Sequence, residues 1–265
     1  MLLKLSLRSI IIALSVYSFI IDGGVAGCAA SEAGETTSVP KTRKPQQVIQ
    51  ETAVARFHQR EEQFANVLRS AVWQYGLISV CWENPKPAQY TDLKLIRLSI
   101  ANTWEKHSNV KFAGWDRCKR TGPAYVRVLL ADTDPKVVGG IGSEISGKPN
   151  NVILNITFQK DPYLKERCTR SQDARIKCIR GMAIHEFGHV LGFAHEQNRK
   201  DTPKWCKDFE SGRSGDWTSA IWDRDSVMNY CSSVREGFQE WPQRQNLSEI
   251  DILAVQKLYG VPANN

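Results

Sequence analysis

The chain has 265 residues, of which 42% are apolar and 24% are charged, and its formal net charge is +7. A chain of this length and apolar content can bury a sizeable core within one domain. The positive charge is modest and gathers most clearly at Lys41-Thr-Arg-Lys44. Because no basic strip interleaved with aromatic residues accompanies it, the composition argues against a nucleic-acid partner.

Residues 1–28 have the pattern of an export signal. A start with two basic residues precedes the apolar stretch Ile10–Ile21, which is shorter than the roughly 20 residues of a membrane-spanning helix. The stretch ends in Val25-Ala-Gly-Cys28, which resembles a bacterial lipobox whose cysteine becomes the lipidated N-terminus; ordinary cleavage after Ala30 is the alternative. We expect an exported outer-membrane or cell-surface lipoprotein anchored through Cys28, or otherwise a periplasmic or secreted protein.

The next two segments separate this signal from the main domain at 77–265. Residues 29–50 are rich in Ser, Thr, Glu, Lys and Pro, which predicts a flexible tether. Residues 51–76 carry apolar side chains at helical spacing and end at Gly76, which predicts an N-terminal helix. This helix is either an extra packed element or a pro-segment.

The main domain mixes strands and helices. Alternation and apolar runs predict strands at Leu77–Trp82, Val110–Gly114, Tyr125–Leu130 and Val152–Ile156, and helical spacing predicts a helix at Asp92–Lys106. Gly139–Glu144 is predicted as an irregular edge strand, although its glycines are equally typical of a turn. Residues 197–245 show no period, which predicts mostly loop. The domain is therefore expected to be α+β.

Three of the five histidines lie in one eleven-residue stretch that reads H-E-x-x-H-x-x-G-x-x-H. On a helix, His185 and His189 share a face, and Glu186 overhangs the same point without being a ligand. Gly192 permits the turn that brings in His195 as a third ligand. Three neutral nitrogens leave the fourth position of a tetrahedral zinc open, as in catalytic sites. One zinc ion is the expected cofactor.

A second signal follows in Ser226-Val-Met-Asn-Tyr230. By itself it is ordinary core sequence, but after the long zinc motif it matches the Met-turn of metzincins. Together with His185–Arg199, which includes Glu196 directly after the third histidine, and the helical run Leu247–Tyr259, it makes the chain resemble the astacin family of metalloendopeptidases. The resemblance is strong over the second half of the domain and looser over the first.

This resemblance implies a zinc-dependent endopeptidase with a metzincin-like fold. A twisted mixed sheet and the zinc helix would lie above a cleft, with an irregular lower half and a C-terminal helix below it. The enzyme is expected to be a monomer. It would hold protein or peptide substrates extended in the cleft, paired with the edge strand at 139–144. Glu186 would be the general base, Tyr230 a movable ligand that stabilises the transition state, and Met228 a support beneath the ligands. A core tyrosine is the alternative role for Tyr230.

The resemblance leaves open the partner of Glu196 and also one rival function. In astacins, the residue matching Glu196 contacts the new N-terminus that pro-segment removal creates, and a lipidated Cys28 cannot supply that amine. Either a further cleavage occurs near residue 76, or Glu196 has another partner. The rival function is a non-catalytic zinc-containing surface binding lipoprotein, which would have no use for Glu186 and Tyr230.

The cysteine count also fits an exported protein. The chain has seven cysteines, and lipidation of Cys28 leaves an even set, as expected of three disulfides in an oxidising compartment. Local pairing is our preferred connectivity, with free thiols as the alternative for a cytoplasmic protein. The expected bonds are Cys168–Cys178, Cys206–Cys231 and Cys81–Cys118.

Overall fold

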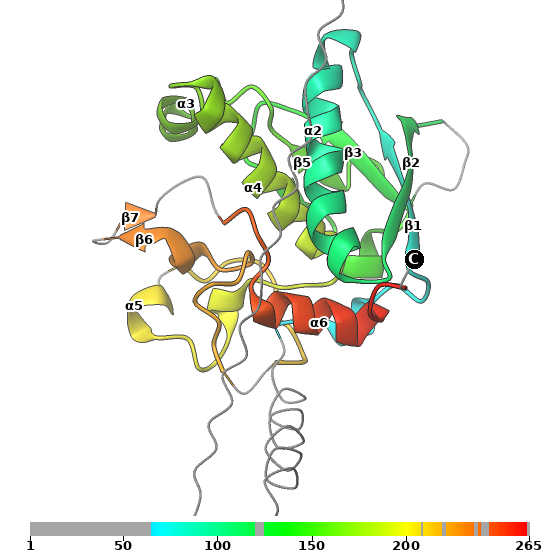
Figure 1. Cartoon of the computed structure of the whole chain (residues 1–265). Coiled ribbons are helices and arrows are strands. Elements are labelled where there is room, and N and C mark those ends of the chain that lie inside the picture. Colours follow the sequence, from blue (N-terminus) through cyan, green and yellow to red (C-terminus); the bar gives the residue numbers. More distant parts are fainter. Residues whose placement is uncertain are drawn as a thin grey trace, which may run out of the picture. The chain divides into compact units, whose positions relative to one another are not determined.

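A five-stranded sheet flanked by helices forms the upper half of the domain in Figure 1. The computed structural model describes residues 65–119, 125–207, 209–218, 221–235, 238–239 and 244–263. The expected export signal with its lipobox, the tether and residues 51–64 lie outside the described residues. Of the helices in this described part, none combines the length and the apolar character needed to cross a membrane.

The sheet has the strand order β2-β1-β3-β5-β4. Its parallel strands are β1 (Leu77–Trp82), β2 (Lys111–Arg117), β3 (Val126–Leu130) and β5 (Val152–Leu154). The short strand β4 (Lys136–Val137) lies antiparallel to β5 at one edge. The parallel strands lie close to their predicted positions, and the mixed sheet confirms the α+β class.

The prediction of an edge strand at Gly139–Glu144 is wrong. The edge strand is β4, a few residues earlier, and the glycine segment bends away and enters a 3₁₀ turn at Gly142–Ile145. The reason is backbone conformation: Gly139, Gly140 and Gly142 have φ values of 85°, 135° and 57°, which an extended strand does not use. The turn alternative is therefore the correct one for these glycines.

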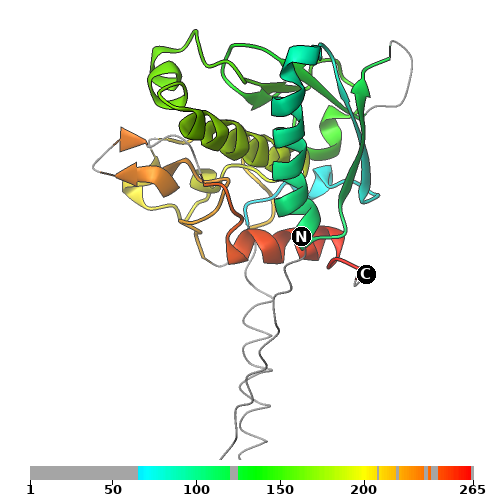
Figure 2. The ribbon, with the colours of Figure 1, turned by 45° about the horizontal axis from the view of Figure 1, so that its top comes forward.

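Helices α2 (Tyr90–Ile100) and α4 (Gln172–Val190) pack against each other (Figures 1 and 2). Helix α2 continues through a π-helical turn at Ala101–Glu105, so the predicted helix at 92–106 is confirmed with an earlier start. A short helix, α3 (Pro162–Cys168), precedes α4 and was not predicted.

Helix α4 has clear start and stop signals. The hydroxyl of Ser171 accepts a hydrogen bond from the amide of Ala174 at 3.0 Å and caps the first turn. The second half of the helix is buried almost continuously, so packing rather than one apolar stripe stabilises it. Gly192, with φ at 93°, ends the helical path.

The lower half is mostly irregular, as predicted for residues 197–245. It contains α5 (Lys204–Lys207), the short hairpin of β6 (Val234–Arg235) and β7 (Phe238–Gln239), and α6 (Glu249–Tyr259). The hydroxyl at the end of α6, on Tyr259, donates a 2.8 Å hydrogen bond to the carbonyl of Leu191. The C-terminal helix therefore holds the C-terminal end of α4.

The predicted helix at 51–76 is wrong for residues 65–76. Ala65, Val67 and Ala71 are buried, but the chain is extended at Val67 and only Arg69–Ala71 forms a 3₁₀ turn. Val67 bridges Phe193 on one side and Trp217 on the other. Apolar spacing alone does not distinguish a buried strand from a helix, and this segment is buried between two chain segments that satisfy its backbone.

All three predicted disulfides form between the expected cysteines. They join β1 to the residue after β2, α3 to α4, and α5 to the residue after the Met-turn. The bonds are Cys81–Cys118, Cys168–Cys178 and Cys206–Cys231.

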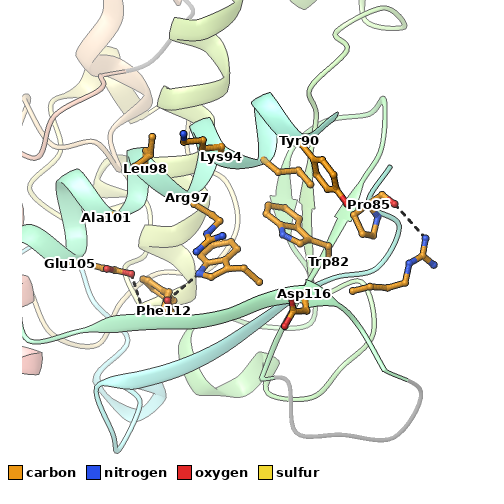
Figure 3. A pocket seen from close by; sticks show the side chains of 13 residues that line it. Trp82, Pro85, Tyr90, Lys94, Arg97, Leu98, Ala101, Glu105, Phe112 and Asp116 are labelled. Carbon is orange, nitrogen blue, oxygen red and sulfur yellow. Dashed lines mark hydrogen bonds between the residues drawn. The ribbon is translucent and has the colours of Figure 1, made fainter. Parts of the chain in front are cut away.

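A groove of about 630 Å³ lies between α2 and β2 (Figure 3). Its floor contains Trp82 and Trp115, with ring centroids 5.3 Å apart, and the guanidinium of Arg97 lies 5.6 Å from the Trp115 ring. Phe187 of α4 stacks on Trp115 at 5.6 Å and meets Phe112 edge-on at 5.0 Å. One aromatic layer therefore joins the groove to the helix that carries His185 and His189.

Candidate active site

Three imidazoles converge where α4 ends and the chain turns. The Nε2 atom of His195 lies 3.2 Å from that of His185 and 3.0 Å from that of His189. Two of these residues lie one turn apart on α4, and the third comes from the extended chain after Gly192. The structure therefore confirms that the motif brings three ring nitrogens close together around one point.

Backbone carbonyls fix the tautomer of all three rings. The Nδ1 atoms of His185, His189 and His195 lie 2.8, 2.7 and 2.8 Å from the carbonyl oxygens of Val227, Phe193 and Ser211, respectively. A carbonyl only accepts, so each Nδ1 donates its proton. Every Nε2 therefore presents a lone pair toward the shared point, as metal-binding imidazoles do.

This arrangement fits a zinc ion. Zinc–nitrogen bonds of about 2.0–2.1 Å in a tetrahedron place ligand nitrogens about 3.3 Å apart, close to the observed 3.0 and 3.2 Å. Burial lowers the pKa of His185 to about 3 and that of His189 well below its usual value. Both rings are therefore neutral and able to bind a metal. Three lone pairs aimed at one point repel one another unless a cation lies between them.

The Met-turn lies directly beneath the ligands. The carboxylate of Asp251 on α6 accepts hydrogen bonds from the Ser226 hydroxyl at 2.7 Å and the Val227 amide at 2.9 Å. These bonds hold the backbone of Val227, whose carbonyl oxygen accepts the Nδ1 proton of His185. Met228 is buried under α4, and its carbonyl accepts a 3.0 Å hydrogen bond from the amide of Glu196.

Glu186 is a buried polar group at this site that lacks a hydrogen-bond partner among the described residues. Its side chain is 4% exposed, and its Oε2 atom has no hydrogen-bond partner among the described residues. Burial raises the pKa of Glu186 to about 8. A buried carboxyl oxygen without a partner costs stability, so such a group is typical of a site whose partner arrives with a ligand.

The ring of Tyr230, which comes from the lower half of the domain, lies close to the rings of His195 and His185. Its ring centroid lies 4.4 Å from that of His195 and 5.3 Å from that of His185. Burial, followed by the nearby carboxylates of Glu186 and Asp134, raises the pKa of Tyr230. The phenol therefore keeps its proton and remains a hydrogen-bond donor near neutral pH.

Glu196 has partners within this chain. It is fully buried, and it accepts hydrogen bonds from the backbone amides of Asn66 at 3.1 Å and Asp223 at 2.9 Å. The Nε atom of Arg199 lies 3.3 Å from the same carboxylate. In the intact chain Glu196 therefore has partners other than a free N-terminus, and a further cleavage near residue 76 stays a prediction.

A cleft of about 300 Å³ opens above the histidines. Glu186, His189, His195 and Tyr230 line it. It is also lined by β4 with Gly140 and Ile141, and by Ser211–Arg213. Arg213 also forms an ion pair with Glu144, which lies in the 3₁₀ turn after β4. Sequence reasoning missed the contribution of Ser211, whose role depends on its backbone carbonyl.

Comparisons with known proteins agree with this geometry. Residues 171–240 match the model of the peptidase family named Astacin. The "Astacin-like metalloendopeptidase" of Coturnix japonica is 29% identical over 105 residues, which cover 30% of this chain and only 26% of that protein.

Two solved structures align with this chain, and the first of them is similar in fold. The structure of myroilysin aligns with a TM-score of 0.50 at 18% identity, over 76% of this chain and 100% of that chain. Archaemetzincin from Methanopyrus kandleri aligns with a TM-score of 0.38 at 12% identity, over 70% of this chain and 97% of that chain. The segment of residues 171–240, which holds the three converging histidines and the Met-turn, matches the Astacin family model, and the fold of the chain is similar to that of myroilysin.

Proposed function

We propose that the chain is a zinc-dependent endopeptidase that hydrolyses peptide bonds of protein or peptide substrates. The observation that carries this proposal is the placement of the unpartnered carboxylate of Glu186 in the same cleft as three converging Nε2 atoms. A site built only to hold a structural ion has no need for a buried carboxyl group without a partner. The proposed enzyme is a monomer.

The chemistry divides among three parts of the site. A bound zinc ion supplies Lewis-acid polarisation of the scissile carbonyl and lowers the pKa of water to about 7. A cation bound by the three histidines would favour the ionised form of Glu186, which takes the proton of the attacking water and delivers it to the leaving nitrogen. Tyr230 donates a hydrogen bond to the developing oxyanion, a type of contact worth roughly 3 kcal/mol. The raised pKa of Tyr230 supports this donor role.

Substrate is proposed to lie extended along β4. This strand is at the edge of the sheet and lines the cleft, so its outer backbone groups are available to a peptide strand. Lys136 and Val137 replace Gly139–Glu144 in this role, because the positive φ values of Gly139, Gly140 and Gly142 interrupt any extended run in the glycine segment.

Glu186→Gln tests the proposal. This variant keeps the size and burial of the side chain, so it should bind one zinc ion while peptide hydrolysis falls by at least ~10²-fold. Glu166→Gln, an exposed change on α3, is the matched control and should retain full activity. Proteolysis by Glu186→Gln at the wild-type rate would overturn the assignment. A zinc-loaded wild type that cleaves no peptide library would favour the rival non-catalytic zinc-containing binding protein.

Export and anchoring through Cys28 form the second part of the proposal. The lipobox-like sequence and the three disulfides, which persist in oxidising compartments, support it. Expressed in a Gram-negative host, the chain should enter the membrane fraction with an acylated Cys28, and Cys28→Ser should release it. Mass spectrometry showing an unmodified N-terminus at Ser31 would overturn lipidation while leaving export intact.

A further inference from the structure

The third histidine needs restraints that the zinc helix does not provide. His185 and His189 lie within α4, where helical hydrogen bonds fix their backbones. His195 lies beyond Gly192 in extended conformation, with φ at −63° and ψ at 132°. Its position must therefore be set by contacts from elsewhere in the chain.

Asn66 supplies one set of these contacts. Its side-chain Nδ2 donates to the carbonyl of His195 at 2.7 Å, and its backbone carbonyl accepts from the Ala194 amide at 2.8 Å. Its backbone amide donates to the carboxylate of Glu196, and its Oδ1 accepts from Gly215 at 3.0 Å. Asn66 is fully buried, and three of its four polar groups therefore bind three consecutive residues centred on the third ligand.

Asn198 supplies a second set through Ser211. The carbonyl of Ser211 receives the Nδ1 proton of His195 at 2.8 Å. The Nδ2 of Asn198 donates to that same carbonyl at 2.7 Å and to the carbonyl of Arg213 at 3.0 Å, while its Oδ1 accepts from the Ser211 amide at 3.0 Å. Asn198 therefore holds the acceptor that sets the ring orientation and tautomer of His195.

We infer that Asn66 and Asn198 are positioning residues for the metal. One holds the backbone of His195, and the other holds the carbonyl that orients its ring. The inference rests on the zinc site of the proposed function but not on peptide hydrolysis. A metal ligand must be placed to about 0.2 Å, and partners of this indirect kind typically change metal affinity by about 10–100-fold when mutated.

Isosteric variants provide the test. Asn66→Asp keeps the acceptor for Gly215 but loses the donor to His195, and Asn198→Asp keeps the acceptor for the Ser211 amide but loses both donors to carbonyls. Asn151→Asp is the matched control, since Asn151 is also fully buried and donates to the carbonyls of Tyr125 and Ile145 at 2.9 and 2.8 Å. It lies at the start of β5 rather than around His195.

The zinc dissociation constant, measured by competition with a chromophoric chelator, should rise at least ~10-fold in both test variants. The visible absorption of the cobalt-substituted protein should change in band position or intensity, because it reports the ligand geometry. Asn151→Asp should lower the melting temperature without changing either metal readout. These readouts distinguish positioning of a ligand from general support of the fold.

A His195→Ala background makes the test specific. If the two asparagines act through His195, then Asn66→Asp and Asn198→Asp should no longer weaken zinc binding once that ligand is absent. Because Asn198 is only half-buried, its variant remains informative if Asn66→Asp does not fold.

Unchanged zinc affinity and cobalt spectra in folded test variants, or equal losses with and without His195, would overturn the inference. A wild type that binds zinc but cleaves no peptide would instead overturn the proposed function and leave this inference standing.

Discussion

Gly188 lies where the packing beneath the metal site leaves no room for a side chain. It lies on α4 between the first two ligands, and a Cβ atom added there would overlap the sulfur of Met228 and lie 3.1 Å from Cζ2 of Trp104. Gly188→Ala therefore has two opposing effects. Alanine stabilises a helix interior by about 1 kcal/mol relative to glycine, whereas overpacking a filled core costs about 1–3 kcal/mol.

The overlap with the sulfur is severe, so we expect the packing cost to dominate. Gly188→Ala should lower the free energy of unfolding by up to about 2 kcal/mol, the difference between the two effects. Met228→Ala alone should cost about 2–5 kcal/mol, because it leaves a cavity beneath the ligands. In that background the sulfur is gone, so Gly188→Ala should become neutral or stabilising by up to about 1 kcal/mol.

The assay is urea unfolding of the four proteins of this double-mutant cycle, with chelator present so that zinc binding does not contribute to stability. The decisive result is the reversal or loss of the Gly188→Ala effect between the two backgrounds. An equal loss of stability in both would show that Met228 is not what excludes a side chain at position 188.

Three further outcomes are expected. Tyr230→Phe should keep its zinc and its substrate affinity while kcat falls by roughly 10²-fold; an unchanged kcat would return Tyr230 to a core role. Replacing Cys206 and Cys231 together with alanine should lower the free energy of unfolding by about 3 kcal/mol, since the bond closes a 25-residue separation; an unchanged melting temperature would contradict this. For Glu83, burial by itself raises the pKa, but the hydrogen bonds from Arg127 and Asn150 outweigh it and lower the pKa below 4.5. Its stabilising effect is therefore present above pH 4.5 and is lost as the pH falls through the lowered pKa, so Glu83→Gln should destabilise the protein by about 1–3 kcal/mol at about pH 7 and by progressively less in acid. A cost that does not depend on pH would contradict the charged pair.

The sequence predicted best the elements whose pattern is local. Strand β1 lies where alternation placed it, at Leu77–Trp82, and the end of α4 follows from the spacing of His185 and His189 and from the stop at Gly192. The disulfide Cys168–Cys178 spans 10 residues, so proximity in sequence favoured its pairing. In each case the deciding information lies within a short window of sequence.

Residues 65–68 show why other predictions were wrong. Their apolar residues fit a helical period, but the backbone amide of Val67 binds the carbonyl of Trp217, and that of Leu68 binds the carbonyl of Gly192. These partners are more than a hundred residues away in sequence. A helix would satisfy the same backbone groups internally, so only the tertiary structure decides between the two conformations. Long-range pairing of this kind leaves no periodic signal in the segment itself.

The metal site also combines features that a short stretch of sequence predicts with features that depend on the tertiary structure. The ligands could be predicted, because imidazole is rare in this chain and its spacing at His185, His189 and His195 is informative. The groups that fix the protons of those ligands could not, because all three are backbone carbonyls, which every residue possesses. The side chains that hold those carbonyls are common asparagine and aspartate residues, such as Asn198 beneath Ser211 and Asp251 beneath Val227. The sequence motif therefore identifies the residues that can bind a metal, whereas the fold determines how firmly their side chains are held.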